Sequence, residues 1–221
     1  MHMRRGLAEL LGTMMLVATV VGSGIMGERL AGGNVAVALL ANTAATAAAL
    51  VALITTLAPV SGAHFNPVVT VVEALAGALP WRAVPTYLSA QLIGGVAGTL
   101  VAHVMFELPL VSLSTHVRAG PAQIASEVVA TAGLLLVIAG VSRARASAVA
   151  GCVASWIAAA YWFTASTSFA NPAVTIARAL SDTFAGIRPV DVPGFLVGQA
   201  LGAAVAVLVT RALWPPPERT S

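Results

Sequence analysis

Two Asn-Pro pairs are the residues whose types and spacing indicate chemistry most specifically in this chain. Asn66-Pro67 lies in "FNPVVTVVEAL" at 65–75 and Asn171-Pro172 lies in "ANPAVTIARAL" at 170–180. Asparagine is a preferred N-cap and proline is favoured at the first helical position, so each pair predicts the start of a short helix. An asparagine amide that faces a cavity can also donate hydrogen bonds to a passing solute.

Two acidic residues, Glu9 and Glu127, stand inside long apolar runs. A carboxylate is expensive at that depth, so we expect each to accept hydrogen bonds from the backbone of a nearby loop and to hold that loop in place. His64, two residues before Asn66, either orients the first loop or lines a pore; a structural histidine with satisfied hydrogen bonds is an equally good interpretation.

The remaining reactive residues do not form a catalytic set. Cys152 is the single cysteine, which excludes an intramolecular disulfide and a thiolate metal cluster. His64 and His103 lie on separate segments without matching ligands. We therefore expect neither an enzyme nor a bound metal or cofactor.

Composition places the chain in a lipid bilayer. Of its 221 residues 58% are hydrophobic and only 9% are charged, which is too little polar surface for a soluble globule. The arginines are scattered along loops and ends, so no basic face for nucleic acid is expected and membrane lipid is the expected surrounding. Six apolar stretches have spanning length, at 6–26, 34–57, 83–106, 121–141, 147–164 and 193–213, and two segments at 66–79 and 171–182 are too short to cross.

The two halves of the chain repeat the same landmarks in the same order. Glu9 corresponds to Glu127, the first Asn-Pro pair to the second, and Gln91 to Gln199. Each half, 1–106 and 121–221, has three spans and is joined to the other by a linker at 107–120, so the halves of this single domain, 1–221, enter the membrane from opposite sides. The prediction is an all-α membrane protein with six transmembrane helices and two re-entrant half-helices in an inverted repeat.

The inverted repeat predicts a pore. The N-termini of the two half-helices should meet near the membrane midplane, where irregular backbone is tolerated only if it is buried or lines a water-filled cavity. Each N-terminus carries about half a positive charge, which repels cations, including protons.

The distribution of arginines predicts the orientation of the chain. One side of the membrane is richer in arginine than the other, and the richer side is expected to be cytoplasmic together with both termini. On the richer side are Arg4, Arg5, Arg82, Arg143, Arg145, Arg211 and Arg219, and on the other are Arg29, Arg118, Arg178 and Arg188.

These motifs resemble those of the aquaporin and aquaglyceroporin channels, the major intrinsic protein family. The resemblance implies a homotetramer with one pore in each protomer and passive flux of water or small neutral solutes. It also implies a pore motif formed by Asn66, Pro67, Val68, Asn171, Pro172 and Ala173. The stretch "ARALSDTFAGIRP" at 177–189 is similar to bacterial members associated with arsenic resistance, which implies the inner (plasma) membrane of a bacterium.

The selectivity filter that the resemblance implies departs from the family pattern. Val174 stands where an arginine commonly follows the second motif, and gap-free counting adds Thr46, Ala159 and Ser168 to the filter. These side chains are small or medium-sized and none is aromatic, so the filter is expected to be wide. The expected solutes are water, glycerol-like polyols, neutral metalloid hydroxides such as arsenite, and methylated arsenicals.

Two alternatives stay open on the sequence alone. Arg178 either lines the outer vestibule, or it extends to the membrane interface or pairs with Asp182; the second arrangement is favoured. An ion-coupled secondary transporter is the alternative function, because carriers are also built from inverted repeats with broken helices.

Overall fold

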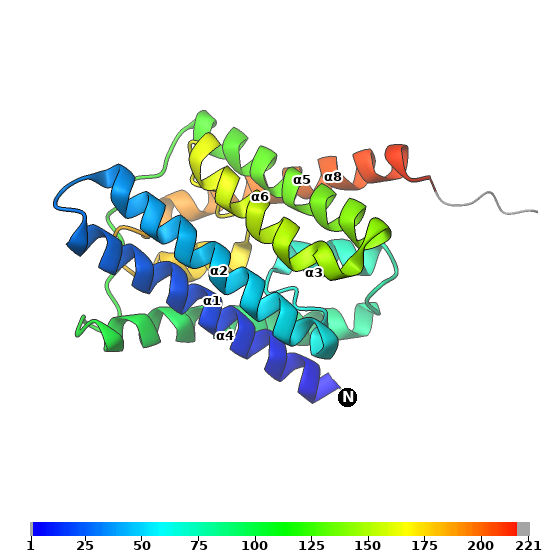
Figure 1. Ribbon diagram of the computed structural model, residues 1–221, viewed down its shortest axis with the longest axis horizontal. Helices are drawn as coiled ribbons and strands as arrows, with labels where there is room; N and C mark the ends of the chain where they lie inside the picture. The colour runs from blue at the N-terminus through cyan, green and yellow to red at the C-terminus, as the bar shows by residue number, and fades with distance from the viewer. Residues whose placement is uncertain (1, 216–221) are drawn as a thin grey trace, which may run out of the picture.

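The computed structural model describes residues 2–215 and is all α-helical (Figure 1). Arg219, one of the arginines used to predict orientation, lies outside the described residues. Short 3₁₀ turns precede α4, α6 and α8 at Trp81–Ala83, Ala146–Ala148 and Pro189–Asp191. The helices are α1 (His2–Leu30), α2 (Val35–Ser61), α3 (Pro67–Leu75), α4 (Val84–Met105), α5 (Pro121–Ala144), α6 (Val149–Phe163), α7 (Pro172–Arg178) and α8 (Val192–Leu213).

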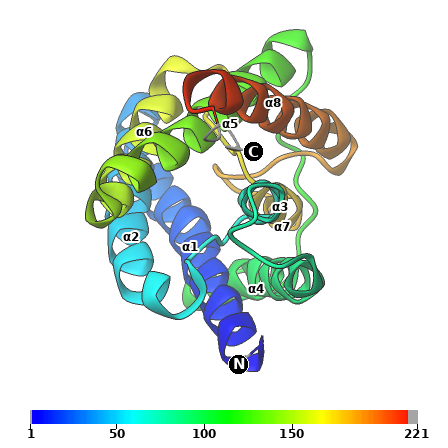
Figure 2. The same ribbon diagram turned by 90° about the vertical axis from the view of Figure 1, so that its right-hand side faces the viewer.

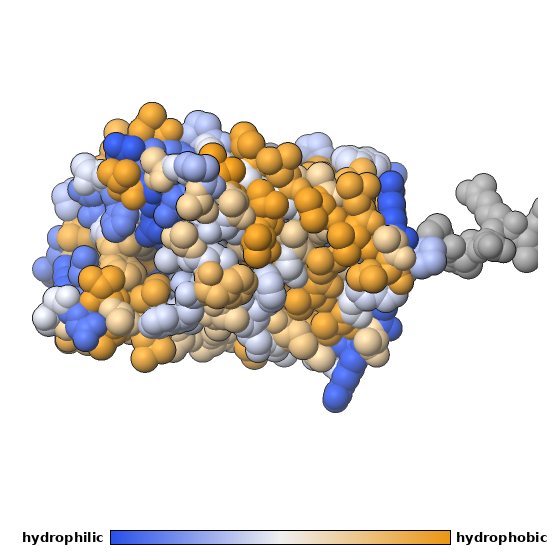
Figure 3. Space-filling model, turned by 90° about the horizontal axis from the view of Figure 1, so that it is seen from above, coloured by the Kyte–Doolittle hydropathy of each residue, from blue (hydrophilic) through white to orange (hydrophobic). Residues whose placement is uncertain are grey.

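The spans and the short helices agree with the sequence prediction. Within residues 2–215, six helical segments are long and apolar enough to cross a membrane. The two short segments form α3 and α7, which end a few residues earlier than predicted. An apolar belt with hydrophilic residues gathered toward both ends covers the face drawn in Figure 3, as expected for a protein surrounded by lipid. The fold class is therefore confirmed.

The six long helices form a ring that the two short helices complete. α1 packs against α2 and α4, α5 packs against α6 and α8, and α2 contacts α6 to join the two groups. In the end-on view of Figure 2, α3 and α7 lie in the gap between α4 and α8 and so close the ring. α7 also packs against α4, and α3 contacts α8, so each short helix touches a long helix from the other half of the chain.

Glycines allow the long helices to approach closely. A Cβ atom at Gly98 of α4 would lie 2.3 Å from the carbonyl oxygen of Met14 on α1. On the other side, a Cβ at Gly202 of α8 would lie 2.7 Å from the carbonyl oxygen of Val128 on α5. Membrane helices associate through such close backbone contacts, because lipid provides no hydrophobic force between them.

We expect Gly98→Ala to lower the free energy of unfolding by about 1–3 kcal/mol, because α1 and α4 must move apart to admit the methyl group. Thermal unfolding of the purified protein in detergent measures the change. Gly151→Ala is the control, because a Cβ there meets no atom within 4 Å. Equal melting temperatures for the two variants would show that this helix contact does not limit stability.

A candidate pore between the two short helices

The two asparagines cap the short helices and also join them. Asn66 Oδ1 accepts from the backbone N–H of Val68 at 3.0 Å, and Asn171 Oδ1 accepts from Ala173 at 3.0 Å. Asn66 Nδ2 donates to the carbonyl oxygen of Ala170 at 2.7 Å, and Asn171 Nδ2 donates to that of Phe65 at 2.8 Å. These bonds use one N–H of each amide, which leaves the second N–H of each for a solute.

Glu9 holds the loop before α3. It is fully buried, and its Oε1 accepts from Ser61 Oγ at 2.6 Å and from the N–H of His64 at 3.0 Å. Its Oε2 accepts from the N–H of Phe65 at 2.7 Å and from Gln91 Nε2 at 2.8 Å. A single carboxylate therefore satisfies donors from the loop and from α4.

Glu127 does the same for the loop before α7. Its Oε1 accepts from Ser166 Oγ at 2.6 Å and from the N–H of Phe169 at 2.9 Å. Its Oε2 accepts from the N–H of Ala170 at 2.8 Å and from Gln199 Nε2 at 2.7 Å. The pattern of donors repeats that of Glu9 position by position, so each carboxylate contacts the loop that it is predicted to hold.

The loops that these carboxylates hold have strained backbone. Ala63 and Phe65 have φ angles of 52° and 49°, and Ser168 and Ala170 have φ angles of 51° and 47°. Such left-handed conformations cost about 1–3 kcal/mol each for residues other than glycine. Hydrogen bonds from these stretches to buried carboxylates offset that cost, so the carboxylates maintain the shape of the loops.

A cavity of about 430 Å³ passes the two asparagines. Arg5 and Glu73 line it toward one end, and Phe169 and Arg178 line it on the other side of the asparagines. Its walls are mostly apolar side chains of α1, α2, α5 and α6, namely Leu16, Val20, Leu50, Ile54, Leu134, Ile138, Val149, Val153 and Ile157. Polar side chains, including the two asparagines, interrupt this apolar wall, and such an arrangement can orient a small solute.

Only part of the predicted pore motif faces this cavity. Asn66 and Asn171 line it, whereas Pro67, Val68 and Pro172 line an apolar hollow beside α8. Ala173 is buried. The prolines and small residues thus position the half-helices, and the asparagines present the polar groups.

The structure brings three of the four predicted filter residues to the cavity. Thr46, Ser168 and Val174 line the cavity, but Ala159 does not and is exposed on α6. The α6 residues that do line it recur every fourth position and include Ile157 and Tyr161. Ala159 therefore lies on the opposite side of the helix, since residues two apart differ by about 200°.

Tyr161 replaces Ala159 in the cavity wall and brings an aromatic ring to it. Its hydroxyl donates to Thr46 Oγ1 at 3.4 Å, which joins α6 to the neighbouring helix α2. Phe169 adds a second ring, so two aromatic side chains line the cavity beside the three predicted filter residues. Gap-free counting failed because it took no account of which face of α6 meets the cavity. The apolar residues at every fourth position of α6 are the sequence signal for the face that lines it.

His64 satisfies both interpretations offered for it. Its side chain lines the cavity, and its Nδ1 lies 3.1 Å from Thr70 Oγ1. Its ring also packs against Tyr87, with centroids 5.2 Å apart.

Arg178 lies in the cavity wall, and the favoured sequence interpretation of it is wrong. It is only 2% exposed, its Nε donates to the carbonyl oxygen of Ala185, and its Cζ lies 3.4 Å from the centre of the Phe169 ring. Asp182 instead accepts hydrogen bonds from the backbone and hydroxyl of Thr115. The contact with Phe169 keeps the guanidinium inside the protein.

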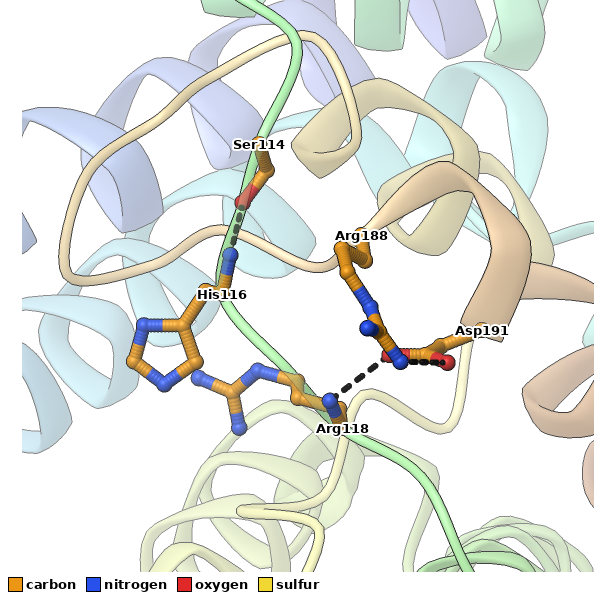
Figure 4. A network of polar contacts seen from close by, with 5 residues as sticks. All are labelled: Ser114, His116, Arg118, Arg188 and Asp191. Atoms are coloured by element: carbon orange, nitrogen blue, oxygen red, sulfur yellow. Dashed lines mark hydrogen bonds and ion pairs between the residues drawn. The ribbon is translucent and has the colours of Figure 1, made fainter.

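Sequence reasoning also missed the role of Arg118 in the linker. Its Nε donates to the carbonyl oxygen of Gly186 at 2.7 Å, and its backbone N–H donates to Asp191 Oδ2 at 2.9 Å. Asp191 pairs in turn with Arg188 at 2.9 Å (Figure 4). Burial lowers the pKa of Arg118 to about 10, so the side chain keeps its charge at neutral pH.

Six spans, two half-helices and a cavity bordered by two asparagine amides define a membrane channel rather than an enzyme. The Major intrinsic protein family matches residues 1–159, and the chain belongs to this family. It is similar to Aquaglyceroporin AqpS of Rhizobium meliloti, with 54% identity over 96% of this chain and 91% of that protein.

Two further comparisons agree with this assignment. Probable aquaporin NIP7-1 of Arabidopsis thaliana is 40% identical over 43% of this chain and 34% of its own length. The aquaglyceroporin from Plasmodium falciparum has the same fold, with a TM-score of 0.70 over 96% of this chain and 95% of that one, at 22% identity.

Glu127→Gln is expected to lower the free energy of unfolding by about 2–4 kcal/mol. Four donors now share the two carboxylate oxygens of Glu127, whereas the amide of glutamine has only one acceptor oxygen. Thermal unfolding in detergent, followed by tryptophan fluorescence, measures the change. Glu28→Gln is the control, since Glu28 is an exposed acid on α1. A melting temperature for Glu127→Gln equal to that of the control would contradict the loop-holding role.

Cysteine substitution tests which residue of α6 faces the pore. Replacing Cys152 by serine gives a background without cysteine, into which Tyr161→Cys or Ala159→Cys is introduced. A small water-soluble methanethiosulfonate reagent should block solute flux through the protein with Tyr161→Cys, because only that position lines the cavity. Block at Ala159→Cys and not at Tyr161→Cys would restore the original assignment.

Proposed function

We propose that this protein is a passive channel for glycerol-like polyols, water and neutral metalloid hydroxides such as arsenite, with methylated arsenicals among its solutes. The absence of an arginine at Val174 carries the proposal. Val174 lies in the cavity wall one helical turn from Asn171, where a guanidinium would narrow the passage and hold a positive charge. The name aquaglyceroporin given to AqpS supports glycerol as a solute.

The proposed filter consists of Thr46, Ser168, Val174 and Tyr161. The hydroxyl groups of three of these residues and the amides of the asparagines replace water around a solute, while the apolar wall excludes strongly hydrated ions. Coupled transport is disfavoured because Glu9 and Glu127 have all their oxygens occupied by loop and glutamine donors.

The assembly and orientation are part of the same proposal. We infer a homotetramer in the plasma membrane of a bacterium, with both termini in the cytoplasm and the two halves, 1–106 and 121–221, inserted in opposite directions around the linker at 107–120. The arginine distribution along the chain supports this orientation.

Val174→Arg is expected to reduce glycerol flux at least about tenfold, because the guanidinium narrows the filter. Water flux should persist, because the narrowed passage is still polar and still admits water molecules. Stopped-flow light scattering on proteoliposomes, with glycerol, arsenite and water gradients, measures both. Val174→Thr is the matched control, since it keeps the shape of valine, and it should conduct like the wild type. Wild-type flux that saturates and follows an ion gradient would instead support the carrier.

A further inference from the structure

The Arg178 end of the cavity contains a buried guanidinium without an acidic partner. The Nε of Arg178 donates to Ala185, but within residues 2–215 its two Nη atoms have no hydrogen-bond partner. The ion pair found in the same part of the chain joins Arg188 to Asp191 and does not involve Arg178. Because Arg178 lines the cavity, these free N–H groups are available to whatever enters it.

A second arginine strengthens the positive charge at this end. The Cζ of Arg118 lies 5.0 Å from the centre of the Phe169 ring that also contacts Arg178. Burial, Arg118 and Arg178 together lower the pKa of His116, which stands beside Arg118 in the linker (Figure 4). Arg118 differs from Arg178 in that its donors are used by the carbonyl oxygens of surrounding loops, so it supplies charge and Arg178 supplies free donors.

The acids of this region already have other partners. Asp182 accepts from Thr115, Asp191 pairs with Arg188, and Glu127 accepts from loop donors and Gln199. A buried charge without a counter-charge is costly. An anion in the cavity would therefore be stabilised by the charge of two arginines, neither of which has its guanidinium hydrogen-bonded to a carboxylate within residues 2–215.

The shape of the site indicates which anion. A guanidinium presents parallel N–H groups that match the two oxygens of a carboxylate, and the Phe169 ring fixes its plane. Val174 on α7 offers an apolar contact and Tyr161 on α6 a hydroxyl among the residues that line the cavity. We propose that the Arg178 end of the cavity binds small monocarboxylates, and that a bound carboxylate obstructs the passage of polyols. This inference rests on the proposed channel function, because both use one cavity.

Glycerol and lactate are suitable probes, because they are similar in size and differ in charge. Glycerol flux into proteoliposomes is measured by light scattering with increasing lactate, at equal concentration on both sides of the membrane. Lactate should reduce wild-type glycerol flux in a saturable way. Lactamide, the neutral counterpart of lactate, should reduce it far less, and this comparison requires no variant.

Three variants locate the site. Arg178→Gln should conduct glycerol and raise the half-inhibiting lactate concentration at least about tenfold, since the bidentate charged contact is lost. Arg178→Lys, which keeps the charge without the planar pair of donors, should give a smaller increase. Arg29→Gln removes an exposed charge that does not line the cavity and that has no ion pair within residues 2–215, so it should leave the lactate effect unchanged.

The outcomes separate this inference from the proposed function. Glycerol flux that lactate does not inhibit, or that lactamide inhibits equally, would overturn the carboxylate site and leave the channel intact. Equal lactate inhibition of the wild type and Arg178→Gln would also overturn it. Absence of wild-type glycerol flux would refute the channel function itself, and direct titration of the detergent-solubilised wild type with lactate would then decide whether the carboxylate site exists.

Discussion

Two buried carboxylates make the rest of this structure possible. Loop backbone at the depth of the membrane core has no water to bond with, so each of its N–H groups needs an acceptor from the protein. Glu9 and Glu127 supply those acceptors for His64, Phe65, Phe169 and Ala170, whose strained stretches lead directly into the short helices. The close approach of α4 to α1 and of α8 to α5 delivers a glutamine donor to each carboxylate as well.

With the loops held in place, the direction in which the chain runs through each short helix determines the electrostatic field in the pore. Both short helices present their N-termini to the asparagine region, where their dipoles oppose cations and favour hydrogen-bond acceptors. Beyond that region the two ends of the cavity differ, since Glu73 lines one and Arg178 the other. Glu73 and Arg178 occupy equivalent positions of the two short helices and carry opposite charges. A solute in the pore therefore experiences an electric field directed along the pore axis.

The sequence was most informative where a residue can be understood from its neighbours in the chain. Asn66 and Asn171 as caps, and Glu9 and Glu127 as loop acceptors, follow from helix-end chemistry and from the cost of burying charge. Tyr161 was missed because its importance depends on which face of α6 meets the cavity. Arg118 and Phe169 lie far apart in the sequence, and only the folded loops bring them together with Arg178.

In the channel that we propose, the position of Arg178 would let a wide filter still discriminate against cations. An arginine at Val174 would both narrow the passage and charge it. Arg178 follows Val174 by four residues, so its Cα atom lies about 6 Å farther along the axis of α7. Its flat contact with Phe169 keeps it against the wall. The width of the passage and its positive charge are thereby set by different residues. The Arg178 guanidinium repels a cation through its low-dielectric surroundings, and it does not occupy the space in the passage that a polyol needs.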